Sequence, residues 1–408
     1  MGAQISPATS GERFLAVYRL RGDEARARAL AEAIVVEQTV EFPRHLLPPG
    51  GIEEHVVGRV ERLEPDGPDA WRCTVAYPVE DTGWELPQLL NVAWGNVSLM
   101  PGVRLVDLSP SPSLYARLPG PRFGRQGLRE RLGVPARPLL CTALKPMGLT
   151  ASELAAYAHD FALGGIDLIK DDHGLANQPF APWRERVARC AEAVGKANAR
   201  TGRRCLYLPN VSAPADELLE RAHVARALGA GGLLVSPGLT GLDAMRALAV
   251  DDGLDLPILA HPAFLGTYAL GPDQGIAFDV LFGTLMRLAG ADAVIFPNHG
   301  GRFSLRSEDC RQIVAGTGRS LGPVRPAFPV PGGGMRLERI PDMVAEYGRD
   351  VVLLIGGGLF ALGLGVRESS ERFLAAVQDS AGGAAPSPPP PAPLGPERAA
   401  GAGPRATV

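Results

Sequence analysis

Short apolar runs alternate with longer amphipathic stretches along most of the chain, from residue 138 onward. Apolar runs of strand length occur at residues 139–146, 166–172, 205–211, 232–236, 257–261, 292–297, 325–331 and 351–355. The stretches between them predict helices, for example at residues 151–163, 183–199, 216–228 and 278–288. This order predicts an α/β protein whose residues 134–380 form a closed (β/α)8 TIM barrel, with a doubly wound open sheet as the competing arrangement.

The first part of the chain has a different pattern, in which turn residues separate short apolar stretches. The predicted strands lie at residues 14–20, 56–63 and 71–78, and an Ala- and Arg-rich helix is predicted at residues 23–35. We therefore expect residues 1–133 to form an N-terminal α+β domain of ferredoxin-like type.

The composition excludes several classes of protein. A formal net charge of -3 over 408 residues gives no electrostatic reason to expect nucleic acid or a membrane surface as a partner. The five cysteines are scattered and lack paired spacing, which is typical of reduced thiols in a cytoplasmic protein. No secretion signal or membrane-spanning stretch is recognisable. Residues 381–408 are rich in Pro, Ala and Gly and predict a disordered tail, because they cannot bury a core.

The second predicted barrel strand ends abruptly in a charged cluster. Side chains alternate along a strand, so Lys170 and Asp172 share one face, while Asp167 and Asp171 share the other. A lysine beside an aspartate at a strand end forms an ion pair, or it holds a metal if the lysine is chemically modified. Both interpretations stay open from these residues alone.

Polar residues and glycines also follow the other predicted strands, where barrel enzymes place their chemistry. These residues are Lys145, Asn210, His261, Asn298 and His299, followed by the glycine triplets 332–334 and 356–358. Glycine backbone approaches an anion closely and its amides donate hydrogen bonds, so the two triplets predict a phosphate site. Tight turns without a ligand are the alternative.

Several separated motifs resemble, in order and spacing, the large subunit of ribulose-bisphosphate carboxylase. They are Lys145-Pro146-Met147-Gly148-Leu149, residues 164–173, Gln178-Pro179-Phe180, Trp183-Arg184-Glu185-Arg186, residues 356–358 and Gly95-Asn96-Val97. The similarity covers about residues 10–375, and it identifies the chain as a RuBisCO-like protein of this superfamily.

The resemblance implies a metal centre. In the family, the lysine that matches Lys170 reacts with carbon dioxide, and the carbamate and two neighbouring carboxylates hold magnesium. The corresponding ligands here are Lys170 as N6-carboxylysine, Asp172 and His173. Because His173 replaces a carboxylate with a softer ligand, Mg²⁺ or another divalent metal is expected.

Departures from the family pattern imply a different substrate. Pro262, Ile295 and Gly332 replace the arginine, histidine and serine that serve one phosphate of the carboxylase's bisphosphate substrate, and Met147 replaces a second active-site lysine. We therefore do not expect a true carboxylase. The residues expected to bind the remaining phosphate and the substrate are Gly333, Gly334, Gly356, Gly357 and Arg302, which stands near the position of the family's closing lysine.

The resemblance also assigns roles to other residues. Lys145 and His261, together with Lys170, are the candidate catalytic residues. Glu37 and Asn96 match positions that in the family reach the active site of a partner subunit, which implies a homodimer with shared active sites.

The predicted function is metal-dependent enolate chemistry on a phosphorylated keto sugar or sugar acid. The favoured reaction is decarboxylation or carboxyl transfer on a 3-oxo sugar acid phosphate, because a metal provides the electron sink that a β-keto acid needs. One alternative is an isomerase or enolase acting on a 5-methylthioribulose-type sugar phosphate. The other is a non-catalytic regulator that binds a sugar phosphate.

Overall fold

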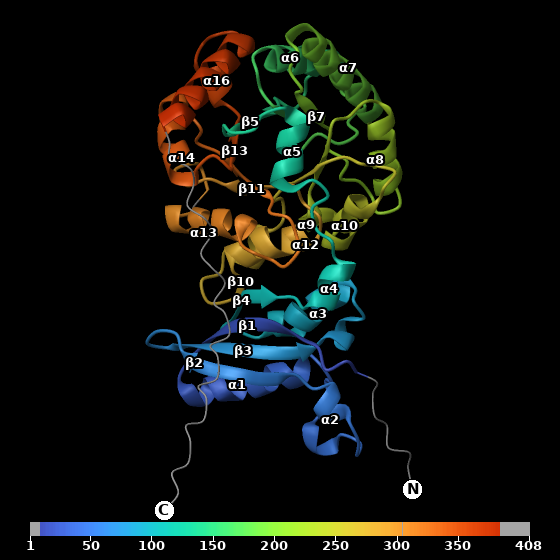
Figure 1. Cartoon of the computed structure of the whole chain (residues 1–408), viewed down its shortest axis with the longest axis vertical. Coiled ribbons are helices and arrows are strands. Elements are labelled where there is room, and N and C mark those ends of the chain that lie inside the picture. Colours follow the sequence, from blue (N-terminus) through green and yellow to red (C-terminus); the bar gives the residue numbers. More distant parts are fainter. Residues whose placement is uncertain (1–8, 304, 384–408) are drawn as a thin grey trace, which may run out of the picture.

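The computed structural model describes residues 9–303 and 305–383. It contains two sheets, one of five strands near the N-terminus and one of eight parallel strands surrounded by helices (Figure 1). Within the described ranges, no helix is both long and apolar enough to cross a membrane. The five cysteines are buried and form no disulfide.

The N-terminal sheet has the strand order β10-β4-β1-β3-β2. Its strands are β1 (Arg13–Arg21), β2 (Arg59–Pro65), β3 (Ala70–Pro78), β4 (Val103–Ser109) and β10 (Gly275–Ile276). The helices and turns of this part are α1 (Glu24–Glu37), η1 (Arg44–Leu46), α2 (Ile52–His55), η2 (Val79–Thr82), α3 (Leu86–Trp94), η3 (Asn96–Leu99) and α4 (Pro112–Arg117). The order β1-α1-β2-β3-α3-β4 and the antiparallel pairing confirm the predicted ferredoxin-like arrangement, although neither α3 nor β4 was predicted.

The barrel strands are shorter than the apolar runs that predict them. They are β5 (Leu139–Leu144), β6 (Leu168–Asp171), β7 (Leu206–Leu208), β8 (Leu233–Val235), β9 (Ile258–Ala260), β11 (Ala293–Pro297), β12 (Phe328–Gly332) and β13 (Val352–Ile355). Their order is β7-β6-β5-β13-β12-β11-β9-β8. A parallel bridge between Asn210 and Leu234 joins the two end strands, and the Gly231 amide donates to the Tyr207 carbonyl at 2.9 Å. The barrel is therefore closed, as predicted, and the open-sheet alternative is wrong.

Helices surround the barrel (Figure 1). They are α6 (Ala151–Leu163), α7 (Trp183–Thr201), α8 (Leu218–Ala227), α9 (Pro237–Thr240), α10 (Leu242–Val250), α11 (Gly266–Ala269), the π-helix η4 (Val280–Leu285) with α12 (Met286–Leu288), α13 (Ser307–Gly318), η5 (Leu337–Arg339), α14 (Ile340–Tyr347), α15 (Gly358–Ala361) and α16 (Val366–Gly383). Helix α6 has the predicted bounds because Thr150 and Glu153 form a capping box at its start. Helix α16 extends three residues into the segment assigned to the tail, and residues 384–408 lie outside the described part.

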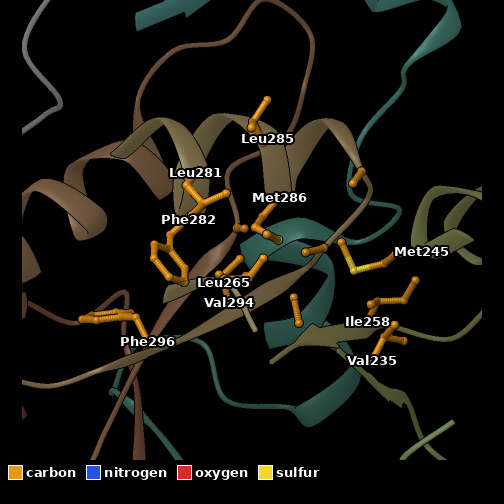
Figure 2. Packing of buried hydrophobic residues seen from close by; sticks show 14 of the residues in the cluster. Val235, Met245, Ile258, Leu265, Leu281, Phe282, Leu285, Met286, Val294 and Phe296 are labelled. Carbon is orange, nitrogen blue, oxygen red and sulfur yellow. The ribbon is translucent and has the colours of Figure 1, made fainter. Parts of the chain in front are cut away.

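Two apolar layers hold the barrel together. Between strands and helices, side chains such as Val235, Met245 and Ile258 belong to the same apolar cluster as Leu285 and Met286 of η4 and α12 (Figure 2). Inside the barrel, a second cluster includes Leu128 and Leu132 of α5 (Gly124–Leu132), which closes the end opposite the carboxyl ends of the strands. By this packing α5 belongs with the barrel, although it precedes the predicted boundary at residue 134.

A short strand from the barrel part of the chain joins the N-terminal sheet. Strand β10, which follows β9 in the chain, pairs in parallel with β4. The Arg104 guanidinium of β4 donates to the carbonyls of Ala269, Gln274 and Ile276, each at 3.1 Å, and also to that of Gly271. Arg104 thus contacts four carbonyls that hold residues 269–276 against the N-terminal domain, and Ala269 and Leu270 of this segment border the cavity described below.

We expect Arg104→Met to loosen this segment without unfolding the barrel. Hydrogen bonds from a charged donor are worth about 1.5–3 kcal/mol each, so amide exchange at Ile276 and Ala277 should rise at least about tenfold. Hydrogen-exchange mass spectrometry measures this change. Arg21→Met is the matched control, because Arg21 meets Asp273 only at 4.0 Å and is half exposed. Equal exchange in both variants would contradict the role of Arg104.

Candidate active site

A cavity of about 1430 Å³ opens at the carboxyl ends of the barrel strands. Its lining includes most of the predicted site residues, namely Lys145, Lys170, Asp172, His173, His261, Arg302, Gly333, Gly334, Gly356 and Gly357. The structure therefore brings together residues at or after the ends of six different strands, β5, β6, β9, β11, β12 and β13, as expected for a barrel enzyme.

Lys170 lies in the wall of this cavity, on β6. Its side chain is only 2% exposed, and among the described residues its amine donates to the Asp171 carbonyl at 3.1 Å and forms no ion pair. Burial lowers the pKa of Lys170 from its ordinary value, because an ammonium loses its hydration there. A larger share of neutral amine follows, and only the neutral amine attacks carbon dioxide.

Asp172 is the charged centre of the site. Its Oδ1 lies 3.2 Å from Lys145 Nζ and 3.4 Å from His173 Nδ1. Burial acts to raise the pKa of Asp172, but the hydrogen bond from His173 and the positive charges of Lys170 and Lys145 outweigh it and lower this pKa well below its ordinary value. Asp172 is therefore a carboxylate over the whole physiological pH range.

His261 presents a hydrogen-bond donor to the cavity. Its ring stacks on that of His173, with 4.2 Å between the ring centroids and an interplanar angle of 12°. Burial, followed by the charges of Lys170 and His173, keeps the pKa of His261 far below its ordinary value, so the imidazole is neutral. Because Nδ1 accepts the Ala263 amide at 3.2 Å, the proton of this neutral ring resides on Nε2. His261 thus suits donation to a substrate oxygen rather than proton abstraction.

The two glycine triplets lie side by side, because β12 pairs with β13. Gly333 and Gly334 have φ values of 102° and 67°, which side chains rarely adopt. A Cβ at position 334 would lie 2.9 Å from the Gly300 carbonyl oxygen, so the close approach of two loops also requires glycine. This bare backbone at the cavity wall suits an anion such as phosphate.

The wall beside β9 and β11 is apolar. Pro262 and Ile295, at two positions where the sequence resemblance implies that phosphate contacts are lost, border the cavity. Further apolar side chains that line the cavity are Phe264, Leu270, Phe278, Phe282, Phe296 and Leu305. Phe282 and Phe296 are continuous with the packed core (Figure 2). Sequence reasoning missed most of this wall because, apart from Ile295 and Phe296 of β11, its residues come mainly from loops and from the π-helical segment, which carry no motif.

Two polar residues after β11 turn away from the cavity. Asn298 Oδ1 accepts the Tyr347 hydroxyl at 2.6 Å, and His299 Nε2 lies 2.8 Å from Glu346 Oε2, both partners being on α14. Neither residue lines the cavity. By contrast, Arg302 of the same loop does, with its guanidinium 5.5 Å from the centre of the Phe303 ring.

Glu37 and Asn96 meet each other but not this cavity. Asn96 Nδ2 donates to Glu37 Oε1 at 2.9 Å and to Glu41 Oε1 at 2.6 Å, in the N-terminal domain. Neither side chain lines the cavity of its own chain. Their contribution to a partner's active site stays a prediction.

Lys170, Asp172 and His173 fit a divalent cation only if Lys170 is carbamylated. In the described part of the chain, no group of three or more His, Cys, Asp or Glu side chains is arranged to hold a metal. Asp172 and His173 provide two adjacent donors, and Lys170 beside them is a buried amine without an ion pair. Carbamylation of Lys170 would add a hard anionic oxygen ligand, so the residues fit a cation after this modification.

Comparisons with known proteins agree with this geometry. Residues 124–371 match the family described as ribulose bisphosphate carboxylase large chain, catalytic domain. The chain is 38% identical over 371 residues to a 5-methylthioribulose-1-phosphate isomerase of Rhodospirillum rubrum, covering 91% of this chain and 97% of the relative. It is 36% identical over 312 residues to a 2,3-diketo-5-methylthiopentyl-1-phosphate enolase of Geobacillus thermodenitrificans, covering 76% and 75%. The crystal structure of a Rubisco-like protein from Rhodopseudomonas palustris superposes with a TM-score of 0.82 at 36% identity, covering 91% and 99%.

We expect His173→Glu to shift metal preference toward magnesium. A carboxylate is a harder ligand than an imidazole, so the ratio of Mg²⁺ to Mn²⁺ affinity should rise by about tenfold. Calorimetric titration in bicarbonate buffer measures both affinities. His173→Gln, with a neutral oxygen donor, is the control for size, and an unchanged ratio in His173→Glu would mean that residue 173 is not a ligand.

Proposed function

The chain belongs to the ribulose bisphosphate carboxylase large-chain family as a RuBisCO-like enzyme, and from this premise we propose that it isomerises a 5-methylthioribulose-type sugar phosphate. The observation that carries the proposal is the division of one cavity into an anion-binding side, a charged centre and an apolar wall. The name of the Rhodospirillum rubrum relative supports the same substrate class.

The phosphate is proposed to lie against the glycine triplets 332–334 and 356–358. Because glycine has no side chain, their backbone amides can approach a phosphate closely. Arg302, at the rim, adds a planar cation that can pair with a phosphate or carboxylate.

The methylthio end is proposed to lie on the apolar wall. A second phosphate there would lose its hydration beside Pro262, Ile295 and the phenylalanine rings without gaining a charged partner. A methylthio group has no such cost, and sulfur makes favourable contacts with aromatic rings. This side of the cavity therefore selects against a bisphosphate.

The reaction needs a proton to leave one carbon and return to its neighbour, with no net gain or loss of atoms. A divalent cation held by carbamylated Lys170, Asp172 and His173 would polarise the substrate carbonyl and stabilise the charge that develops on its oxygen. Lys145, within 3.2 Å of Asp172, is the proposed proton carrier. The His261 Nε2–H is proposed to donate to a substrate oxygen, because Nδ1 is engaged by Ala263.

The pair formed by Glu37 and Asn96 is proposed to complete the cavity of a second copy. Asn96 is exposed and Glu37 is partly exposed, and the two are hydrogen-bonded to each other in the N-terminal domain, away from the cavity of their own chain. The working unit would then be a homodimer with shared active sites.

Decarboxylation of a 3-oxo sugar acid phosphate is the second candidate. Two cations at the rim, Arg302 and Arg336, favour it, since each can hold a substrate carboxylate. It ranks below isomerisation because the apolar wall has no role in recognising a short sugar acid.

We expect the purified protein to convert 5-methylthioribulose 1-phosphate when Mg²⁺ and bicarbonate are present. In deuterium oxide, proton and phosphorus NMR should show a new ketose phosphate with deuterium next to the carbonyl, and a chelator should abolish the reaction. Ribulose 1-phosphate, which lacks the apolar group, should react with a kcat/KM lower by at least about tenfold. Carbon dioxide release from a 3-oxo sugar acid phosphate, without isomerisation, would favour decarboxylation instead.

We expect Lys145→Met to lower kcat about 10²- to 10⁴-fold, because the variant loses the proton carrier. The KM should change little, since Lys145 lies at the charged centre and not at the glycine triplets. Steady-state kinetics separate the two parameters. Lys196→Met, which removes an exposed lysine paired with Glu192 on α7, should leave both unchanged. A wild-type kcat in Lys145→Met would assign the proton transfer to another group.

A further inference from the structure

A fully buried ion pair lies directly behind the candidate metal ligands. Asp171 follows Lys170 in β6 and points into the barrel wall, where its Oδ2 lies 3.2 Å from Arg186 Nε of α7. Both side chains are 0% exposed. Burying two charges costs hydration that their attraction does not fully return, so an apolar pair of similar size would often be as stable. The pair therefore calls for an explanation other than stability.

The pair ties together three segments of the site. Besides Asp171, the Arg186 guanidinium donates to the carbonyls of Ala181 at 2.7 Å and Ala176 at 2.8 Å. These carbonyls belong to the loop that follows the candidate ligands Asp172 and His173. One side chain thus connects the end of β6 with the loop that leads from the ligands into α7.

Strand β7 holds the same carboxylate from the other side. Asp171 Oδ1 accepts a hydrogen bond from the Tyr207 hydroxyl at 2.8 Å. Its Oδ2 accepts one from the backbone amide of Asn210, just after β7, at 3.0 Å. The Asn210 side chain in turn donates to the carbonyls of His173 and Leu175, each at 3.0 Å. The loop that carries His173 is therefore fixed from both neighbouring elements.

Because side chains alternate along a strand, the network around Asp171 also determines which way the neighbouring candidate ligands point. With Asp171 held in the wall, Lys170 and Asp172 must both face the cavity. We propose that Arg186 is a positioning residue, which acts through Asp171 and the 172–182 loop to hold Lys170, Asp172 and His173 in the geometry that binds a cation. This inference rests on the metal-dependent chemistry of the proposed function.

A second buried arginine, Arg287, provides a matched control because its contacts are structural only. Arg287 is also buried, and its guanidinium donates to the carbonyls of Gly316, Arg319, Val324 and Arg325. It does not line the cavity. Loss of Arg287 should destabilise the fold without changing the site, so it separates general stability from positioning.

The experiment compares Mn²⁺ binding among four variants of the full chain, in ¹³C-bicarbonate. They are Tyr207→Phe, Arg186→Met, the double variant Asp171→Asn with Arg186→Met, and Arg287→Met. The double variant removes the buried charge pair but keeps an amide that can still meet Tyr207 and Asn210. Calorimetry and Mn²⁺ electron paramagnetic resonance report affinity and coordination, ¹³C NMR reports the carbamate, and thermal unfolding reports stability.

We expect the double variant to keep a melting temperature near that of the wild type while its Mn²⁺ affinity falls about 10- to 100-fold, with a weaker carbamate signal. Tyr207→Phe should show a smaller change in the same direction. Arg287→Met should lower the melting temperature and keep wild-type Mn²⁺ affinity. If Arg186→Met does not fold, the Mn²⁺ affinities of the double variant and of Tyr207→Phe test the positioning role instead.

Two results would overturn the inference in distinguishable ways. Wild-type Mn²⁺ affinity and carbamate signal in the double variant and in Tyr207→Phe would show that Arg186 has no positioning role, and the proposed function would stand. A wild-type protein that binds no Mn²⁺ in bicarbonate would remove the metal centre itself, and the role of Arg186 with it.

Discussion

The register of β6 is the constraint on which the site depends. Backbone pairing to β5 and β7 sets Lys170 opposite Ala143 and Leu208. Because side chains alternate, a slip of one residue would exchange Lys170 for Asp171 at the cavity wall and destroy the charged centre. The buried partners of Asp171 on α7 and β7 oppose such a slip. Backbone hydrogen bonds and one buried carboxylate thus act together to orient the chemistry.

The order of strands around the barrel explains how the polar and apolar surfaces are distributed in the cavity. The glycine triplets follow β12 and β13, the charged centre follows β5 and β6, and the apolar wall lies beside β9 and β11. A substrate that spans the opening therefore meets an anion-binding surface, a reactive centre and a hydrophobic surface. Under the proposed function, this division would favour a substrate with one phosphate and one apolar group over a bisphosphate.

The N-terminal domain also contributes to the cavity, because it supports the apolar wall. Strand β10 extends the N-terminal sheet, and Arg104 holds residues 269–276 through their carbonyls. The position of Leu270 in the cavity thus depends on a residue more than 160 positions earlier in the chain.

The sequence alone determined the barrel, most of the N-terminal domain and the charged centre. These features follow from short-range patterns, since apolar runs define strands and polar residues at their ends meet at one rim. Only the tertiary structure decided that His299 and Asn298 turn toward α14, that α5 closes the barrel, and that β10 joins another sheet. It also decided the partners of Asp171 and the apolar wall. Such contacts join residues far apart in the chain, and no local periodicity encodes them.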